Sequence, residues 1–309
     1  MTADPRRLDL NGIALTLLAS LIWGGNTIAV KASLQDLPPF RLAWLRFIVA
    51  GLTILVWAWL TKASLRVRRE EQGILFVIGV IFVVQIGLFH IGINLTTAGH
   101  TGVLLNVYPM HLILLSHFFV PGDRLTGRKL LAVLSAYAGV VLVFIPQFRG
   151  GAGSLRGDLI VSGSAILLGI RTILLTRAVQ RVSQIKVLLD QVVMGIPVFF
   201  LLDLMLEQHI PTGYTPRMAL AVLYQGVLVS GFNFMINLWL LKHYRPSTLA
   251  PFFLTTPLFS VLLSWWILDE PLTAYLLAGA FLVAVGIGLA TLRVQRVRPF
   301  ILTRGAPPR

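Results

Sequence analysis

Apolar residues dominate ten stretches of this 309-residue chain, and short polar segments separate these stretches. Each stretch is close to the roughly 20 apolar residues that a helix needs to cross a bilayer. The pattern therefore predicts an all-α integral membrane protein with ten transmembrane helices. We expect these helices near residues 12–32, 40–61, 73–94, 99–120, 129–147, 158–177, 186–206, 217–240, 247–268 and 273–292.

The last five apolar stretches repeat the first five. The segment that starts at Tyr108 reads YPMHLILLSHFFVPGDRLT, and the segment that starts at Thr256 reads TPLFSVLLSWWILDEPLT. We expect one five-helix repeat over residues 1–149 and a second over 150–309. Because the repeat has an odd number of crossings, the two copies have opposite orientations in the membrane. Inverted repeats are typical of secondary transporters, which bind their substrate where the halves meet.

Composition and charge support this topology. The chain is 56% hydrophobic and only 12% charged, although its net charge is +14. If the N-terminus is cytoplasmic, 19 of the 26 basic residues fall in inside segments and four in outside segments. This asymmetry predicts that both termini are cytoplasmic. The basic surplus is then a topology signal, and nucleic acid is not an expected partner.

The chain shows no pattern that predicts an enzyme. It has no cysteine, His90, His111 and His117 lack carboxylates on nearby helical turns, and no spacing resembles a metal site. It has no phosphate-binding loop of the kind that hydrolyses ATP. We therefore expect no cofactor, no metal and no nucleotide, and the expected partners are a small-molecule substrate and the lipid bilayer.

Several short motifs resemble those of a known family. The first span carries Trp23-Gly24-Gly25-Asn26 and Lys31, residues 97–99 read Thr-Ala-Gly ahead of Pro109, and the ninth span closes with Asp269-Glu270-Pro271. In this order, they resemble the drug/metabolite transporter superfamily, and within it the EamA-like ten-helix exporters. The resemblance implies an inner-membrane carrier that exports small metabolites, often amino acids or related compounds. His100 and Leu168 depart from the family pattern, which affects the expected substrate and not the fold.

Polar residues within the spans are candidates for binding the substrate. Such residues either line a cavity or hold helices together by hydrogen bonds, and spacing alone does not decide between the two. The candidates share helical faces or equivalent positions of the two repeats. They are Trp23, Asn26, His90, Asn94, Asn106, Tyr108, Met110, His111, Ser230, Asn233 and Asn237.

Three residues are candidates for gating. Lys31 lies at the outer end of the first span, where it either gates or extends its amine to the interface. Pro109 and Pro257 fall at equivalent positions that we expect to be mid-helix, where proline kinks a helix. These kinks are either bending points or static packing features. We expect Asp269 and Glu270 to cap the tenth helix.

Two charged residues within the spans are expected to form a structural ion pair. Arg171 and Asp190 both lie near the cytoplasmic ends of neighbouring helices. Intramembrane charges commonly pair, although Arg171 could instead reach the headgroups alone. Because the other acids fall near span ends, we expect a facilitator that follows the substrate gradient. Proton exchange on a histidine within the spans, His90, His111 or His117, is the alternative to a facilitator. The alternative to a transporter is a lipid-handling or scaffold subunit of a membrane assembly.

Overall fold

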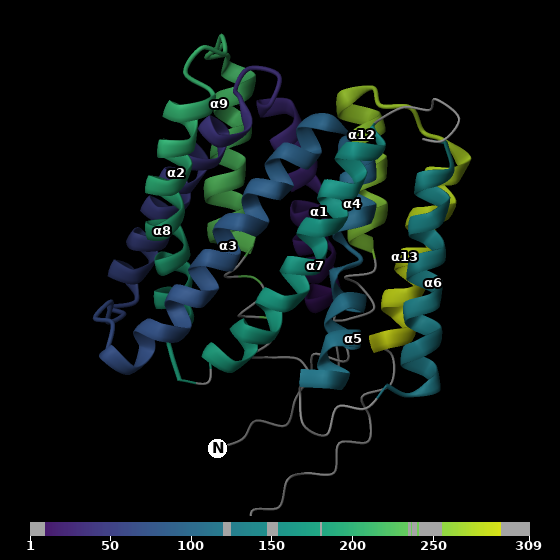
Figure 1. The fold of residues 1–309 in the computed structure, drawn as a ribbon, viewed down its shortest axis with the longest axis horizontal. Coiled ribbons are helices and arrows are strands. Elements are labelled where there is room, and N and C mark those ends of the chain that lie inside the picture. The colour runs from purple at the N-terminus through teal and green to yellow at the C-terminus, as the bar shows by residue number, and fades with distance from the viewer. Residues whose placement is uncertain are drawn as a thin grey trace, which may run out of the picture.

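The computed structural model describes residues 10–119, 125–146, 154–179, 181–233, 236, 240 and 255–291 (Figure 1). These residues form helices and short links, with no strand among them. Six of the described helices are long and apolar enough to cross a membrane, and two shorter apolar helices accompany them. The helices are α1 (Leu10–Ser33), α2 (Pro39–Leu60), α3 (Arg69–Leu95), α4 (Ala98–Leu105), α5 (Tyr108–Phe119), α6 (Gly127–Phe144), α7 (Leu155–Ala178), α8 (Gln184–Leu206), α9 (Pro216–Leu223), the π-helix η2 (Tyr224–Phe232), α12 (Thr255–Leu268) and α13 (Ala274–Thr291).

The starts of these helices follow ordinary capping rules. Thr97, Thr126, Ser183 and Thr215 each precede a helix, and each accepts a hydrogen bond from the backbone N–H three residues later. A hydroxyl at this position satisfies one of the free N–H groups of the first turn. The sequence therefore specifies where these helices begin as well as which residues they contain.

Two of the expected spans are not single α-helices. The span expected at 99–120 is divided into α4 and α5 by a turn at Asn106 and Val107. The Asn106 side chain closes α4 by donating from Nδ2 to the Gly102 carbonyl, 2.6 Å away. The span expected at 217–240 begins as α9 and continues as η2. There the Ser230 hydroxyl donates to the Gln225 carbonyl five residues earlier, which fits the wider π turn.

We call the two ends of the bundle the upper and lower end, as drawn in Figure 1. Helices α1, α3 and α8 end at the upper end, where α2, α4, α7 and α9 begin. Side chains join these ends: Glu207 accepts from the Phe40 and Arg41 N–H groups, and Asp36 accepts from the Thr215 hydroxyl. At the lower end, Lys186 pairs with Glu71 at 3.1 Å. The helices thus run between two polar ends.

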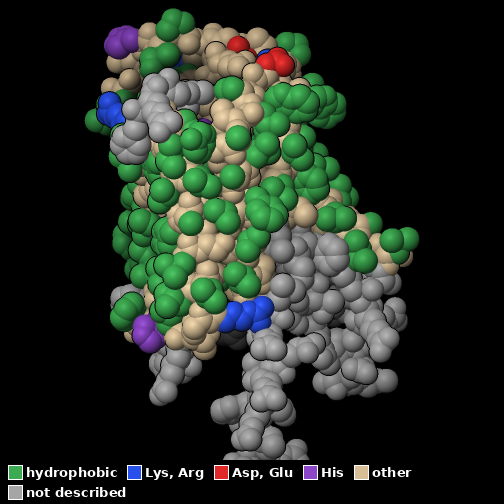
Figure 2. Space-filling model, turned by 90° about the vertical axis from the view of Figure 1, so that its right-hand side faces the viewer, with side chains coloured by type: hydrophobic (Ala, Val, Ile, Leu, Met, Phe, Trp, Pro, Cys, Tyr) green, Lys and Arg blue, Asp and Glu red, His purple; other side chains and the backbone are tan. Residues whose placement is uncertain are grey.

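The surface between these ends is apolar. Figure 2 shows one face of the molecule, on which hydrophobic side chains cover the middle and charged side chains gather toward the two ends. On the surface of α6 and α13, Leu131 and Phe281 are each 60% exposed. Large apolar residues exposed in a continuous band are suited to lipid chains. This distribution agrees with the ten-span membrane topology.

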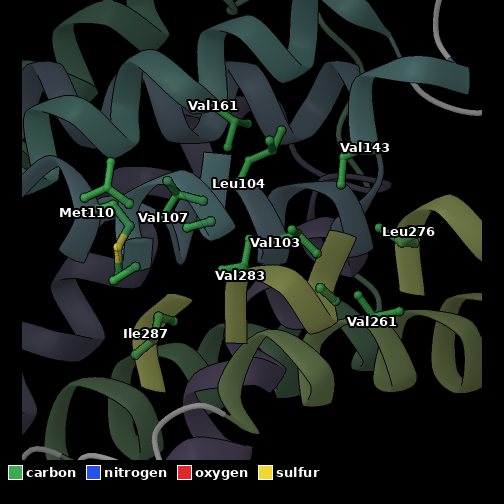
Figure 3. Close-up of a cluster of buried hydrophobic side chains, with 14 residues drawn as sticks. Val103, Leu104, Val107, Met110, Val143, Val161, Val261, Leu276, Val283 and Ile287 are labelled. Carbon is green, nitrogen blue, oxygen red and sulfur yellow. The ribbon is translucent and has the colours of Figure 1, made fainter. Parts of the chain in front are cut away.

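The largest apolar core joins the two halves of the chain. Val103, Leu104 and Val107, around the α4–α5 break, lie in one cluster with Val261 of α12 and Val283 of α13 (Figure 3). Helices α6 and α13 approach each other closely beside this cluster. A Cβ atom added at Gly139 would lie 2.6 Å from the Gly279 carbonyl oxygen, and one added at Gly279 would lie 2.8 Å from that of Gly139. Only glycine permits this backbone approach.

Candidate functional site

The most informative feature of the interior is a set of buried polar atoms without hydrogen-bond partners. Buried polar groups are nearly always paired, so each exception requires an explanation such as water, an ion or a ligand. Here the exceptions come from α1, α2, α3, α5, α7, α8 and η2. They include Asn26 Oδ1, Arg46 Nη1, Gln85 Oε1, His90 Nε2, His111 Nδ1, Arg171 Nε and Nη1, Asp190 Oδ2 and Gln225 Oε1.

Most of these groups fall in two layers. At about 1.5 Å per residue, the upper layer lies on the order of 10 Å below the upper end of its helices. It contains Asn26, Arg46, His90 and Gln225. The lower layer lies about as far above the lower end. It contains His111, Arg171 and Asp190, and Gln85 of α3 lies between the two layers.

The upper layer centres on Arg46 and His90. Arg46 is 6% exposed and its guanidinium carbon lies 5.2 Å from the centroid of the Phe47 ring. His90 is fully buried, and its Nδ1 lies 3.0 Å from the Ile86 carbonyl oxygen. Because a carbonyl oxygen can only accept, Nδ1 carries a proton, and in the neutral imidazole the unpartnered Nε2 is then a hydrogen-bond acceptor. The layer therefore offers one cationic donor and one neutral acceptor.

Asn26 is held in this layer by packing around the preceding glycines. The Gly24 carbonyl accepts hydrogen bonds from Thr27 and from Ser260 of α12. A Cβ atom added at Gly24 would lie 2.9 Å from Cβ of Phe259. The glycine therefore allows α1 to approach the fourth span of the opposite half.

The second half repeats this arrangement. Gly169 and Thr172 of α7 match Gly24 and Thr27, and Arg171 occupies the position of Asn26. A Cβ atom added at Gly169 would lie 3.0 Å from Cβ of His111, so α7 approaches the fourth span of the first half in the same way. Because the halves are inverted, these equivalent positions place Asn26 in the upper layer and Arg171 in the lower layer.

The lower layer contains opposite charges that do not pair. The Arg171 guanidinium carbon lies 5.1 Å from the centroid of the Phe82 ring, while Asp190 lies beside Gly79, one turn earlier on α3. Among the described residues, the ion pairs are Arg41–Asp203, His100–Asp158 and Lys186–Glu71. The expected Arg171–Asp190 ion pair is therefore not formed: the two side chains come from different helices that pack against one face of α3.

An aromatic pair connects the two layers. The Phe47 and Phe82 ring centroids are 5.1 Å apart, with Arg46 beside the first ring and Arg171 beside the second. Gln85, one turn above Phe82, donates from Nε2 to the Ser164 hydroxyl of α7. The two guanidinium groups are thus linked through continuous side-chain contact.

Lys31 lies above the upper layer and holds the end of α3. Its amine donates to the carbonyl oxygens of Ile93, Asn94 and Thr96, at 2.9, 3.1 and 2.6 Å. These carbonyls belong to the last turn of α3 and the residue after it, where a cation is favourable. Lys31 therefore joins α1 to α3 and does not extend to the interface.

The other candidates have differing environments. Tyr108 is partly buried at the start of α5, and Asn233 is fully buried at the end of η2. Met110 is fully buried within the apolar cluster of Figure 3, which excludes it from a polar layer. Trp23 is 51% exposed, and Asn94 is exposed in the last turn of α3.

Asn106 and Ser230 satisfy backbone carbonyls, as described above, and Asn237 lies outside the described residues. Ser230 also borders a small apolar cavity of about 120 Å³ between α2, α8 and η2. The cavity is lined by Thr53, Ile54, Val56, Trp57, Leu60, Ile185, Leu188, Ser230 and Gly231.

Pro109 is not in the middle of its helix, and the mid-helix position expected for Pro257 stays a prediction because residues 241–254 lie outside the described residues. Pro109 is the second residue of α5, directly after the break, where its missing N–H interrupts no helical hydrogen bond. Pro257 is the third residue of α12 as described. The expected mid-helix kink at Pro109 is thus replaced by a complete interruption of the helix.

Glu270 also differs from the expectation. Its carboxylate accepts from the Ala98 and Gly99 N–H groups at 2.7 and 2.9 Å, so it caps α4 and not the tenth span. This contact joins the link between α12 and α13 to the first half of the chain.

Three polar residues of the layers were not among the expected site residues: Arg46, Gln85 and Gln225. Each is a polar residue within an apolar span, and this feature of the sequence could have identified it as a candidate. In the described part of the chain, no cluster of three or more histidine and acidic side chains could hold a metal ion.

Comparison with known proteins identifies the family of this chain. The model of the EamA-like transporter family matches it twice, over residues 10–145 and 155–292. The chain belongs to this family. EamA proteins are ten-helix membrane transporters built from two repeats, and they are not enzymes. The expected all-α fold with two inverted five-helix repeats is therefore confirmed, as is the resemblance to the drug/metabolite transporter superfamily.

Individual relatives are distant but nearly full-length. The uncharacterized transporter YoaV of Bacillus subtilis (strain 168) is 21% identical over 279 residues, which cover 90% of this chain and 95% of that protein. A probable amino-acid metabolite efflux pump of Escherichia coli (strain K12) is 24% identical over 285 residues, covering 88% and 92%. One crystal structure matches with a TM-score of 0.64 at 19% identity, covers 91% of this chain and 96% of the other, and supports the fold alone.

Proposed function

We propose that this EamA-family transporter exports small metabolites, amino acids or related amphipathic compounds, by alternating access. The observation that carries the proposal is the pair of unpartnered polar layers, one toward each end of the bundle. Each layer contains an equivalent residue of an inverted repeat, Asn26 above and Arg171 below. Inverted halves that rock against each other can expose such layers alternately.

The direction and the cargo have separate support. We propose that the lower end, where α1 begins and α13 ends, is cytoplasmic, because the basic residues of the sequence follow the positive-inside rule. The name of the Escherichia coli relative supports amino-acid-like cargo and outward movement. We propose that Asn26, His90, Tyr108 and His111 contact the cargo, since three of them carry unpartnered buried atoms and Tyr108 lies one turn before His111 on α5. Pro109, at the α4–α5 break, and Lys31 are the proposed points of movement.

The test is counterflow of radiolabelled amino acids into proteoliposomes loaded with the same unlabelled compound. Wild-type protein should accumulate label above protein-free liposomes. The Asn26→Ala variant should lose most of this flux while its melting temperature stays near that of wild type, because Oδ1 of Asn26 has no protein partner. The matched control is Gln72→Ala. Gln72 is an exposed polar residue of α3, so this variant should transport normally.

The competing function is lipid handling, which the apolar cavity beside Ser230 favours. Its walls suit an acyl chain and not a polar metabolite. Movement of fluorescent phospholipids between leaflets by the same proteoliposomes, together with absent counterflow, would support the competing function and contradict the proposed one.

A further inference from the structure

The two arginines of the polar layers are cations that have no counter-ion among the described residues. Arg46 Nη1 and Arg171 Nε and Nη1 are buried without hydrogen-bond partners. None of the three described ion pairs includes either arginine. The Arg46 side chain is buried and Arg171 is half-buried. Leaving a charge without a partner in such a position is unfavourable, so retaining both requires a compensating role.

Three buried acids, Asp158, Asp203 and Glu207, already have hydrogen-bond partners within the protein. Asp203 pairs with Arg41 and accepts from the Trp44 indole, and Glu207 caps α2. Asp158 accepts from the Thr96 hydroxyl and lies 3.0 Å from His100. Asp190 has a free oxygen but does not pair with Arg171. No acid of the described residues therefore neutralises the two guanidinium groups.

The orientation of both side chains leaves their donors available. Each guanidinium lies over a phenylalanine ring, Arg46 over Phe47 and Arg171 over Phe82. A ring supports the flat face of a guanidinium, whose N–H groups point outward at its edge. That edge matches the two oxygens of a carboxylate or phosphate in a bidentate contact.

We propose that the cargo carries an oxyanionic group, a carboxylate or a phosphate, and that Arg46 and Arg171 bind it. Arg46 binds it in the upper layer and Arg171 in the lower layer, on either side of the Phe47–Phe82 pair. This inference rests on the proposed transport function and specifies the substrate class of the same site. The acidic group replaces the counter-ion that the fold lacks.

The first test compares compounds that differ only in the acidic group. Purified wild-type protein is examined by thermal shift and by counterflow with N-acetylphenylalanine and its amide, succinate and succinamide, and glycerol 3-phosphate and glycerol. An acidic compound should stabilise the protein and exchange across the membrane, while its neutral partner should do neither. The carboxylate and phosphate pairs distinguish the two sources of the oxyanion. Transport of the neutral partners at equal rates would overturn the inference and leave the transport function intact. If no compound exchanges, both are overturned.

The second test uses variants whose stability separates binding from structure. Replacing an unpaired buried charge by an apolar residue is commonly neutral or stabilising. Arg46→Met and Arg171→Met should therefore melt at or above the wild-type temperature, yet bind the acidic compound at least about tenfold more weakly. Arg46→Lys and Arg171→Lys keep the positive charge but lose the guanidinium that makes the bidentate contact. These variants should bind the acidic compound with intermediate affinity. Arg66→Gln, at an exposed position, is the control and should behave as wild type.

The opposite result would assign the arginines a structural role. If both methionine variants melt well below wild type, or if they bind the acidic compound with unchanged affinity, Arg46 and Arg171 do not hold an oxyanion.

Discussion

At the scale of single residues, the interior contains both satisfied and unsatisfied charges. Arg41 and Asp203 lie 2.8 Å apart at the upper end, whereas Arg171 and Asp190 remain separate in the lower layer. The first pair contributes to stability through direct contact. Arg171 and Asp190, which do not contact each other, remain available for a third partner. This suits a site that must alternately hold and release cargo.

A double-mutant cycle tests this difference. Arg171→Met and Asp190→Asn should change the free energy of unfolding additively, within about 0.5 kcal/mol, because the two side chains share no contact. The cycle of Arg41→Met and Asp203→Asn is the matched control and should show a coupling of about 0.5–3 kcal/mol. Denaturation in detergent measures both cycles. A coupling of comparable size for Arg171 and Asp190 would show that they pair in the membrane protein as isolated.

The sequence predicted some of these residues and not others, for physical reasons. Asn26 and His90 were expected because they are polar residues on apolar helices, and both lie in the upper layer. Met110 was expected from its helical spacing relative to Asn106, but the break between the two residues changes the helical phase. Arg46 was not among the expected site residues because a cation in a span can also reach the headgroups, and only the tertiary packing shows that it is buried.

At the scale of helices, the interruption between α4 and α5 and the close approach of α6 and α13 are the main features. Asn at the end of a helix and Pro shortly after it are ordinary termination signals, and Asn106 and Pro109 provide both. Hydropathy nevertheless predicted one continuous span, because the apolar pattern continues across the break. The capping of α4 by Glu270 could not be predicted, since it joins residues 172 positions apart.

The α6–α13 approach leads to a stability prediction. Gly139→Ala should lower stability in detergent by roughly 1–3 kcal/mol, because the new methyl group would overlap the Gly279 carbonyl oxygen and force the helices apart. Gly163→Ala in α7 is the control, since an added Cβ there meets nothing within 4 Å. It should be neutral or stabilising, because alanine favours a helix by about 1 kcal/mol over glycine. Equal melting temperatures for the two variants would contradict the observed packing.

At the scale of the whole molecule, the two inverted halves meet through repeat-equivalent contacts. Gly24 of α1 packs against α12, and Gly169 of α7 packs against α5. The repeat in the sequence was sufficient to predict the inverted architecture. It could not indicate how the helices are joined at the upper end, because this depends on side chains such as Lys31 and Glu270. If the protein exports cargo, these upper contacts must open during the cycle.

Whether transport is coupled to a proton gradient is also a property of the whole molecule. Proton-driven carriers commonly hold a buried carboxylate that exchanges a proton during the cycle, although a histidine can serve instead. Most of the buried acids instead bind a cation, a hydroxyl or backbone N–H groups, and Asp190 is the exception in the described spans. We therefore expect a facilitator: flux in sealed proteoliposomes should follow the cargo gradient, and an imposed pH gradient should not drive accumulation. Asp190→Asn should retain this downhill flux, and Asp203→Asn, which disrupts the pair with Arg41, serves as a control for loss of stability. Uphill accumulation that follows the pH gradient and disappears in Asp190→Asn alone would instead make Asp190 the site of proton exchange.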